Sequence, residues 1–426
     1  MEPRTLEYIR AACNGQLRHG KGQSIATGIS TDSRKFSKGD VFFAIKGERF
    51  DGHDYVVELI GARAVVVEQP VAAKCPTIEV KNVRVALGAF AARYRKDFDL
   101  PVIAIGGSNG KTTTKEVLGT ILEQKFPTVR SEASFNNDIG VPLSLLRIGK
   151  EHRAAVLEVG TNHPGELAPL VRMVHPKYGI ITSIGREHLE FFGRVAGVAQ
   201  EEGWLAELLP ADGKLFIGEG EWTDVIVRRT RATVQVVPKL EFKTHLLGRH
   251  QRLNVALAVA VARELGLNDD QIQKGLGRCK PAKMRLELWE ANSVQVLDDS
   301  YNANADSMLA ALETLKELPS RGRKIAILGD MAELGEHSEA AHAEVGKRVA
   351  EVGIDLLIAI GKYAAIMAKA ACNAEQFADV ERASQALPKL IRAGDLVLLK
   401  ASRAMRLERV GEILKNTSFS SSKVAT

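Results

Sequence analysis

Residues 101–116, PVIAIGGSNGKTTTKE, contain the residue types that bind phosphate. An apolar stretch leads into two glycines, and a lysine and three threonines follow, a pattern that predicts a strand, a glycine-rich turn and the start of a helix. Backbone N–H groups of such a turn and the positive end of the helix dipole attract phosphate oxygens. We therefore expect Lys111 to reach the β- and γ-phosphates of a nucleotide and the Thr112 hydroxyl to hold Mg²⁺.

The loop is shorter than the general phosphate-loop pattern. That pattern has a glycine five residues before Gly110, a position that Ile105 occupies here. The match is therefore to Gly107-Ser108-Asn109-Gly110-Lys111-Thr112-Thr113. A strand-to-helix turn with a surface lysine is the alternative interpretation, and the apolar strand before it and the helix after it favour phosphate binding.

Polar residues also follow two further apolar stretches in the middle of the chain. Glu158 lies in the stretch 154–159, and His188 comes after the stretch 178–183. Ligands of open parallel sheets lie beyond the carboxyl ends of the strands, so these side chains should gather near the phosphate loop. Alone, either could be a helix cap or an ordinary surface residue. Beside a phosphate loop they become candidate ligands of metal ions that bridge phosphates.

Three groups at the front of the chain combine hydroxyls, charges and glycines: Ser30-Thr31-Asp32-Ser33-Arg34, Lys46-Gly47 and Asp51-Gly52-His53-Asp54. They could hold a pyrophosphate and a ribose. A helix cap with a surface salt bridge explains the first group equally well.

The asparagines of the middle segment also allow more than one interpretation. Asn136 and Asn137 enter a predicted helix, so they could bind a sugar or peptide or simply cap that helix. Asn254 lies near the start of a predicted amphipathic helix at 252–265, where a partly buried amide could read an adenine edge.

Alternating apolar strands and amphipathic helices predict an α/β fold of three domains. We expect a small α/β domain at 1–98, a parallel-sheet domain with the phosphate loop at 99–281 and a doubly wound, Rossmann-like domain at 282–414. The serine-rich segment 415–426 lacks periodicity and is expected to be disordered.

Composition indicates an ordinary soluble protein of the cytoplasm. The 426 residues are 45% hydrophobic and 26% charged, and the longest apolar run, 255–262, is too short to span a membrane. The four cysteines lack metal-ligand spacing and are expected to be free thiols. The net charge of +6 comes from basic residues interleaved with acidic ones, which argues against a nucleic-acid partner.

Together these motifs resemble the Mur ligase family over nearly the whole chain. The resemblance rests on STDSR, KG and DGHD at the front, GSNGKTTTKE, FNNDIGVPLSLL, LEVGTNHPGE, IGREHLE, residues 248–254, Arg285, DSYNAN and LGDMAELG. It implies an ATP- and Mg²⁺-dependent amide ligase, expected to be a monomer. The implied reaction adds D-alanyl-D-alanine to UDP-N-acetylmuramoyl-tripeptide through an acyl phosphate, in peptidoglycan precursor synthesis.

The resemblance also implies roles for individual residues. Lys111, Glu158 and His188 would be catalytic. The nucleotide site would comprise Gly107, Ser108, Asn109, Gly110, Lys111, Thr112, Thr113, Asn254, Arg285 and Asp299. The muramoyl substrate and the dipeptide would contact Ser30, Asp32, Ser33, Arg34, Lys46, Gly47, His53, Asn136, Asn137, Thr161, Asn302 and Ser402. The metal ligands would be Thr112, Glu158, His188 and Glu202.

Glu202 is a departure from the family, which has a carboxylated lysine at this position. We hypothesise that Glu202 supplies the carboxylate directly; the alternative is a solvated helix residue, with Glu201 or nothing in its place. Ala305 stands where the family usually has proline, and Ala401 where it often has glycine. If the backbone at Ala401 needs a positive φ, alanine strains it, and the substrate-binding role that the resemblance implies for the next residue, Ser402, is less well supported.

Other functions remain open at this point. A Mur ligase that adds the third-position diamino acid would carry an Asp-Asn-Pro-Arg signature, which this sequence lacks. The folate-polyglutamylating relatives lack the front motifs. A non-catalytic nucleotide-binding homologue is the remaining alternative, and the filled metal-ligand positions favour an enzyme.

Overall fold

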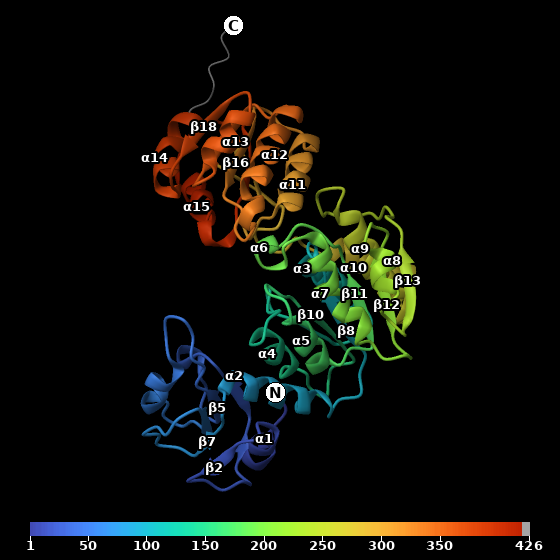
Figure 1. The fold of residues 1–426 in the computed structure, drawn as a ribbon, viewed down its shortest axis with the longest axis vertical. Helices are drawn as coiled ribbons and strands as arrows, with labels where there is room; N and C mark the ends of the chain where they lie inside the picture. The colour runs from blue at the N-terminus through green and yellow to red at the C-terminus, as the bar shows by residue number, and fades with distance from the viewer. Residues whose placement is uncertain (420–426) are drawn as a thin grey trace.

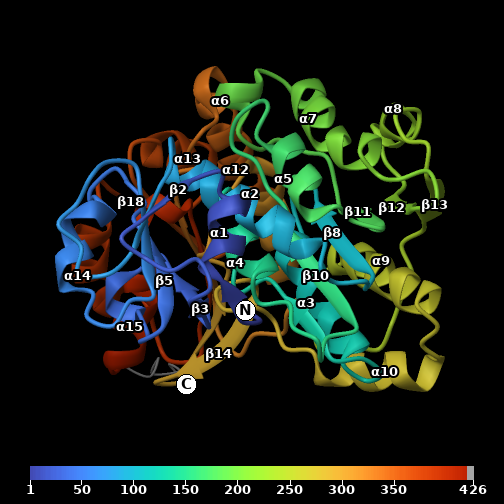
Figure 2. The same cartoon turned by 90° about the horizontal axis from the view of Figure 1, so that it is seen from below.

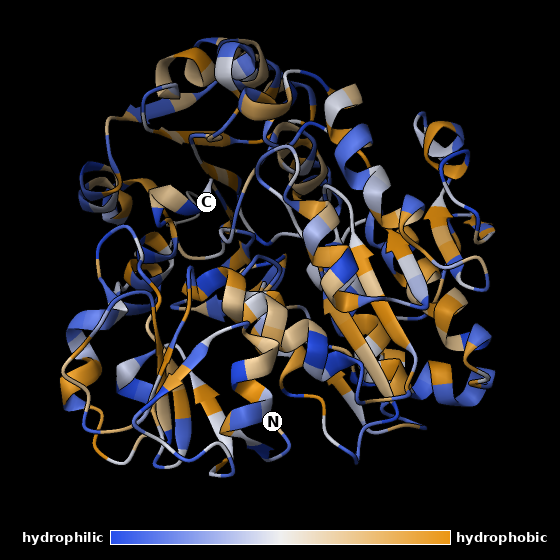
Figure 3. Cartoon of the chain, turned by 60° about the horizontal axis from the view of Figure 1, so that its bottom comes forward, coloured by the Kyte–Doolittle hydropathy of each residue, from blue (hydrophilic) through white to orange (hydrophobic). Residues whose placement is uncertain are grey.

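Three sheets of five or six strands follow one another along the chain in the computed structural model, which describes residues 1–419, and a two-stranded sheet of β1 and β3 accompanies the first. In Figure 1 the first sheet lies at the bottom, the second in the middle and the third at the top, each with its own helices. Apolar segments form the interiors of these layers and polar segments their outer surfaces, as Figure 3 shows. The predicted α/β class with parallel sheets is confirmed.

The first sheet has the strand order β2-β7-β6-β5-β4, in which only the β2–β7 pair is antiparallel. Its unit comprises β1 (Arg4–Thr5), α1 (Leu6–Ala12), β2 (Gln16–Arg18), β3 (Ile25–Ala26), β4 (Gly28–Ser30), β5 (Asp40–Phe43), β6 (Ala64–Val67), β7 (Thr77–Glu79) and α2 (Val83–Arg95). Short 3₁₀ helices occupy Ser33–Lys35 and Gly52–Glu58.

Helix α2 joins the first unit to the second. The Phe90 ring of α2 stacks on Phe43 of β5, with the ring centroids 6.1 Å apart. On another side of α2, a Cβ added at Gly88 would lie only 2.9 Å from the Met173 side chain. The first sheet and the second unit therefore share one continuous apolar core.

The second sheet is entirely parallel, in the order β13-β12-β11-β8-β10-β9. Its elements are β8 (Val102–Gly106), α3 (Lys111–Leu122), β9 (Thr128–Arg130), α4 (Gly140–Leu145), β10 (Ala154–Glu158), α5 (Leu167–Val174), β11 (Tyr178–Ile181), α6 (Leu189–Phe192), α7 (Val195–Glu207), β12 (Lys214–Gly218), α8 (Thr223–Val227), β13 (Thr233–Val237), α9 (Gln251–Glu264) and α10 (Asp269–Arg278).

Strand β8 lies at the point where the strand order of this sheet reverses. The chain passes from β8 to β9 and β10 on one side and then to β11 on the other. Val102 and Ala104 pack toward α5 and α7, and Ile103 and Ile105 pack toward α3 and α9; Figure 2 shows these helices on opposite sides of the sheet. Such a reversal leaves a crevice at the carboxyl end of the central strand, where ligands bind.

The third sheet has the order β14-β15-β19-β16-β17-β18, with only β14 antiparallel. Its elements are β14 (Glu287–Ala291), β15 (Val294–Asp298), α11 (Ala305–Glu317), β16 (Lys324–Gly329), α12 (Ser338–Glu351), β17 (Leu356–Ile360), α13 (Ala364–Ala370), β18 (Ala374–Phe377), α14 (Val380–Leu390), β19 (Leu396–Lys400) and α15 (Glu408–Asn416). Helices α11 to α13 cover one face and α14 and α15 the other, so the predicted doubly wound unit is confirmed.

Helix α15 corrects the predicted start of the tail. It continues to Asn416, two residues past the expected end of the third domain. Residues 420–426 of the predicted disordered tail lie outside the described residues. The domain boundaries themselves, at 98, 281 and 414, stay predictions.

None of the helices within residues 1–419 combines the length and the apolar character that a bilayer crossing requires. All four cysteines are free, as expected: Cys13, Cys75, Cys279 and Cys372.

Candidate active site

The loop between β8 and α3 has the geometry of a phosphate cradle. Gly107 and Gly110 adopt φ values of 109° and 90°, which side chains with a Cβ rarely tolerate. A Cβ at Gly110 would lie 2.3 Å from the Asn254 side chain. The Ser108 and Asn109 amides are held by the neighbouring loop, through Ser183 O (2.8 Å) and Ser183 Oγ (3.0 Å). The predicted strand, turn and helix are all present.

Lys111 points inward, contrary to the surface-lysine alternative. Its side chain is 14% exposed, and its Nζ donates to the carbonyl of Gly107. Burial lowers the pKa of Lys111, but the carboxylates of Glu187, Glu202 and Glu158 outweigh burial and raise it overall. The ammonium is therefore kept charged at the point where phosphate charge would be placed.

Glu158 and Thr112 are brought together as predicted. The Thr112 hydroxyl donates to Glu158 Oε2 at 2.9 Å, and Asn136 Nδ2 donates to Oε1 of the same carboxylate at 3.0 Å. The Ser131 hydroxyl accepts from the Glu158 amide at 3.1 Å. Glu158 is 1% exposed, so these contacts fix a buried carboxylate beside the first turn of α3.

Glu202 contacts the phosphate loop, whereas Glu201 contacts the start of α5. Glu202 is fully buried, and its Oε2 accepts from the Gly107 amide at 2.6 Å. Glu201, one residue earlier on α7, instead accepts from the amides of Gly165 (2.9 Å) and Leu167 (2.8 Å) at the start of α5. The alternative that Glu202 is a solvated helix residue is therefore wrong.

The carboxylate cluster around Lys111 has unused hydrogen-bonding capacity. Glu202 Oε1 and Glu187 Oε1 are buried and have no hydrogen-bond partner within the described residues. Burial raises the pKa of Glu202 to about 8, although Lys111 opposes the shift. Buried carboxylate oxygens without donors suit a cation, which would favour their ionised form.

His188 lies at the boundary with the third unit. Its Nδ1 donates to Glu333 Oε2 at 2.5 Å, and its Nε2 lies 3.9 Å from Glu187 Oε2. Over residues 1–419 no three His, Cys, Asp or Glu side chains converge closely enough to hold a metal ion. The structure therefore groups Thr112 with Glu158 and leaves His188 apart from them.

Of two further predicted nucleotide contacts, Arg285 connects the third unit to the second, and Asp299 has its partners within the third unit. Arg285 stacks on the Tyr301 ring at 4.2 Å and donates to Ser134 Oγ at 3.3 Å. Asp299 pairs with Lys400 at 2.5 Å and accepts from the Leu286 amide at 3.1 Å.

Asn254, the predicted adenine contact, is 5% exposed on α9 and donates to Gln251 Oε1 at 2.8 Å. Its amide packs against Gly110 of the phosphate loop. This residue therefore lies where the helix meets the loop.

The predicted substrate residues of the first unit occupy two loops. Arg34 is exposed and forms a two-point pair with Asp32 (2.9 Å for each bond), which lowers the pKa of Asp32 to about 2. Ser30 Oγ donates to the Asp32 carbonyl at 2.8 Å, and Ser33 begins the 3₁₀ helix that Asp32 caps. This is the helix cap with a surface salt bridge that was one of the two sequence interpretations.

In the second loop, the backbones of Lys46 and Asp51 form an isolated antiparallel β-bridge, and the Gly47 amide donates to the Phe50 carbonyl at 2.9 Å. His53 is 8% exposed, and both of its ring nitrogens have partners: Nδ1 contacts Asp51 at 2.6 Å and Nε2 accepts from the Glu68 amide at 3.0 Å. His53 thus shapes the loop from within.

The remaining predicted contacts also have internal partners. Asn137 Oδ1 accepts from the Gly140 amide at 2.9 Å at the start of α4, and the Thr161 hydroxyl donates to the His163 carbonyl at 2.7 Å. Ser402 Oγ accepts from the Ala332 amide at 2.8 Å, and Asn302 Oδ1 accepts from the Arg403 amide at 3.3 Å. Each of these four residues also makes a second hydrogen bond within its own surroundings.

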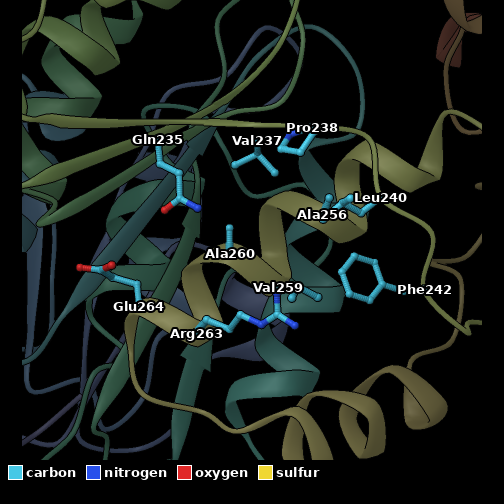
Figure 4. A pocket seen from close by; sticks show the side chains of 10 residues that line it. All are labelled: Gln235, Val237, Pro238, Leu240, Phe242, Ala256, Val259, Ala260, Arg263 and Glu264. Atoms are coloured by element: carbon cyan, nitrogen blue, oxygen red, sulfur yellow. The ribbon is translucent and has the colours of Figure 1, made fainter.

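A separate cavity of about 270 Å³ lies between β13 and α9 (Figure 4). Gln235 and Val237 line it from the strand, and Ala256 and Arg263 line it from the helix. None of the predicted site residues contributes to its wall.

Comparison with known proteins decides the family. Three family models match in order: "Mur ligase family, catalytic domain" at 26–95, "Mur ligase middle domain" at 105–237 and "Mur ligase, glutamate ligase domain" at 284–403. The chain is 35% identical, over 96% of its length and 98% of the relative's, to the UDP-N-acetylmuramoyl-tripeptide--D-alanyl-D-alanine ligase of Escherichia coli (strain K12). This chain belongs to the Mur ligase family.

Solved Mur ligases have the same architecture. MurF from Acinetobacter baumannii superimposes with a TM-score of 0.91 at 31% identity, covering 98% of this chain and 100% of that one. The MurF ligase from Thermotoga maritima, solved in complex with ADP, gives 0.80 at 28% identity, covering 91% and 97%.

In this Mur ligase, sequence reasoning left three side chains around the site without a role. Glu187 faces Lys111 at 3.7 Å, Glu333 holds His188, and Lys115 is fully buried behind the phosphate loop. Lys115 had a usable signal, because a residue four positions after Lys111 lies on the same helix face. Glu187 and Glu333 acquire their contacts only through tertiary packing.

Proposed function

We propose that this chain is an ATP-dependent ligase that adds D-alanyl-D-alanine to UDP-N-acetylmuramoyl-tripeptide during peptidoglycan precursor synthesis. The observation that carries the proposal is similarity over the whole chain to ligases of that name, including those of Escherichia coli (strain K12) and Bacillus subtilis (strain 168), the latter at 32% identity over 96% of this chain. The inward-facing Lys111 and the buried carboxylates beside it provide the matching chemistry.

The proposed reaction has two steps. An oxygen of the tripeptide's terminal carboxylate attacks the γ-phosphorus of ATP, and ADP leaves. The amine nitrogen of D-alanyl-D-alanine then attacks the acyl carbon, phosphate leaves, and the nitrogen loses a proton as the amide forms. Two anions must approach each other in the first step, and the positive charge of Lys111 offsets their mutual repulsion, as fixed cations do in other phosphoryl transfers.

We propose that these residues bind a magnesium ion. Thr112 and Glu158 would hold it, with Glu202 supplying a carboxylate where the family has a carboxylated lysine and His188 joining after it leaves Glu333. The unpartnered oxygens of Glu187 and Glu202 within the described chain are the observation that supports a cation. When bound, the ion would neutralise phosphate charge and polarise the transferred group.

Loops of the first unit would hold the UDP part of the substrate. Arg34 is exposed and available to a pyrophosphate, provided that it exchanges Asp32 for the ligand. We assign the substrate contacts to Ser30, Asp32, Ser33, Arg34, Lys46, Gly47, His53, Asn136, Asn137, Thr161, Asn302 and Ser402. Because the substrates are soluble metabolites, we propose that the enzyme works in the cytoplasm. We also propose that it is a monomer.

The proposal is tested by phosphate release. The purified chain is incubated with ATP, Mg²⁺, UDP-N-acetylmuramoyl-tripeptide and D-alanyl-D-alanine, and each component is omitted in turn. We expect phosphate and a pentapeptide product only in the complete mixture. Turnover with a free diamino acid and the muramoyl dipeptide would instead support the alternative ligase, and no turnover in any mixture would support a non-catalytic homologue.

A further inference from the structure

Lys115 lies one turn after Lys111 on α3, and its side chain is fully buried. Its Nζ donates to the carbonyls of Ser131 (2.8 Å) and Ala133 (2.5 Å), and the Glu116 carboxylate lies 2.9 Å away. A buried ammonium is costly unless hydrogen bonds and opposite charge compensate for its desolvation. These three partners satisfy the three N–H donors of the cation.

The two carbonyls belong to the segment 131–137, which follows β9, precedes α4 and contacts Glu158. Ala133 has a φ of 43°, a left-handed conformation that is unfavourable for a residue with a Cβ. On either side of it, Ser131 Oγ accepts from the Glu158 amide (3.1 Å) and Asn136 Nδ2 donates to Glu158 Oε1 (3.0 Å). Lys115 thus holds the strained turn between the two residues that fix Glu158.

We propose that Lys115 is a positioning residue of the ligase. Its ammonium ties the segment 131–137 to the helix that carries Lys111, so that Asn136 orients Glu158 beside the phosphate loop. Helix α3 thereby positions both Lys111, which would face the phosphates, and the carboxylate of Glu158 opposite it. This role rests on the proposed function and deepens it.

The test is a double-mutant cycle between Lys115→Met and Asn136→Ala. Lys115→Met removes the three donors and keeps an unbranched side chain that is one atom shorter. We expect kcat for ligation to fall by about ten-fold or more, as for other residues that orient site groups. The dissociation constant of ADP, measured by calorimetry, should change by less than about two-fold. In the Asn136→Ala variant, adding Lys115→Met should lower kcat further by less than about two-fold, because both substitutions act through Glu158.

Several results would overturn this role. They are a wild-type kcat in Lys115→Met, a lower melting temperature with unchanged kcat, or losses that multiply in the double mutant. If Lys115→Met does not fold, Lys115→Gln, whose amide still donates to a carbonyl, replaces it in the same cycle. Failure of both variants to fold would make Lys115 a folding residue only. Wild-type ligation is measured first, and its absence overturns the proposed function instead.

Discussion

Glu201 and Glu202 are adjacent on α7, yet their carboxylates serve different parts of the molecule. Glu201 accepts from two amides that open α5, where helix N-terminal N–H groups need acceptors. Glu202 reaches the phosphate loop and leaves one buried oxygen without a hydrogen-bond partner among the described residues. Two neighbouring residues of one helix thus have a structural role and a proposed metal-binding role, respectively.

Substitution of Glu202 can be compared with the same substitution at Glu201, which serves as a matched control. We expect Glu202→Gln to lower the ligation rate by roughly 10–100-fold, because an amide cannot supply the negative charge. Glu201→Gln should keep the rate and lower the free energy of unfolding by about 1–2 kcal/mol, since charged cap acceptors are lost. Ligation rates and urea unfolding of both variants measure this.

The same residue predicts independence from carbon dioxide. If Glu202 itself supplies the carboxylate, wild-type ligation should continue at the same rate in bicarbonate-depleted buffer. A marked loss of rate that added bicarbonate restores would show that a lysine is carboxylated elsewhere in the site, and it would refute direct replacement.

At the scale of elements, the buried strands were the most predictable part. The apolar stretches 154–159 and 178–183 contain the buried strands β10 and β11, and the predicted helix 252–265 differs from α9 by one residue at each end. Strands β13 and β14, which lie at sheet edges, were not predicted, and neither was β12, although it is buried inside the second sheet.

The neighbourhood of the phosphate loop was predictable where a local motif or the strand order of a parallel sheet specifies it. The phosphate loop and its helix follow from local sequence, and the carboxyl-end rule placed Glu158 beside them. The pairing of His188 with Glu333 spans 145 residues, and no local pattern specifies it. Burial of Lys115 likewise depends on a segment that β9 brings to α3.

The loop glycines give a prediction at this scale. Gly110 and Gly165 share a φ of 90°, but a Cβ at Gly110 would meet Asn254 at 2.3 Å, whereas a Cβ at Gly165 would have no described atom within 4 Å. We expect Gly165→Ala to cost about 1–2 kcal/mol of unfolding free energy from backbone strain alone. Gly110→Ala should cost more and should also weaken ADP binding. Equal costs for the two variants would contradict the tight contact with Asn254.

At the scale of the whole molecule, the third unit contacts the loops around the nucleotide site at several points. Arg186 bonds Asp306 through its amide (2.7 Å) and Nε (2.8 Å) and pairs with Glu344 at 2.6 Å. The side chains of Asn109 in the phosphate loop and Asn304 are hydrogen-bonded at 3.0 Å. The position of the third unit is therefore coupled to the loop that would hold phosphate.

We expect nucleotide and muramoyl substrate to favour closure of the third unit onto the second, because predicted contacts come from both. Small-angle scattering should show a smaller radius of gyration with an ATP analogue and the muramoyl substrate. Arg186→Ala removes the side-chain contacts to Asp306 and Glu344 but keeps the amide contact to Asp306, and it should weaken this compaction. An unchanged radius in the wild-type protein would count against closure.

The path of one oxygen atom tests the proposed chemistry most directly. The terminal carboxylate of the tripeptide substrate is labelled with a heavy oxygen isotope, and the phosphate released during ligation is analysed by mass spectrometry. Attack of that carboxylate on ATP predicts that the label appears in the phosphate, because the acyl–oxygen bond breaks when the amine attacks. Ligation that yields unlabelled phosphate would contradict an acyl phosphate and the role of Lys111 in forming it.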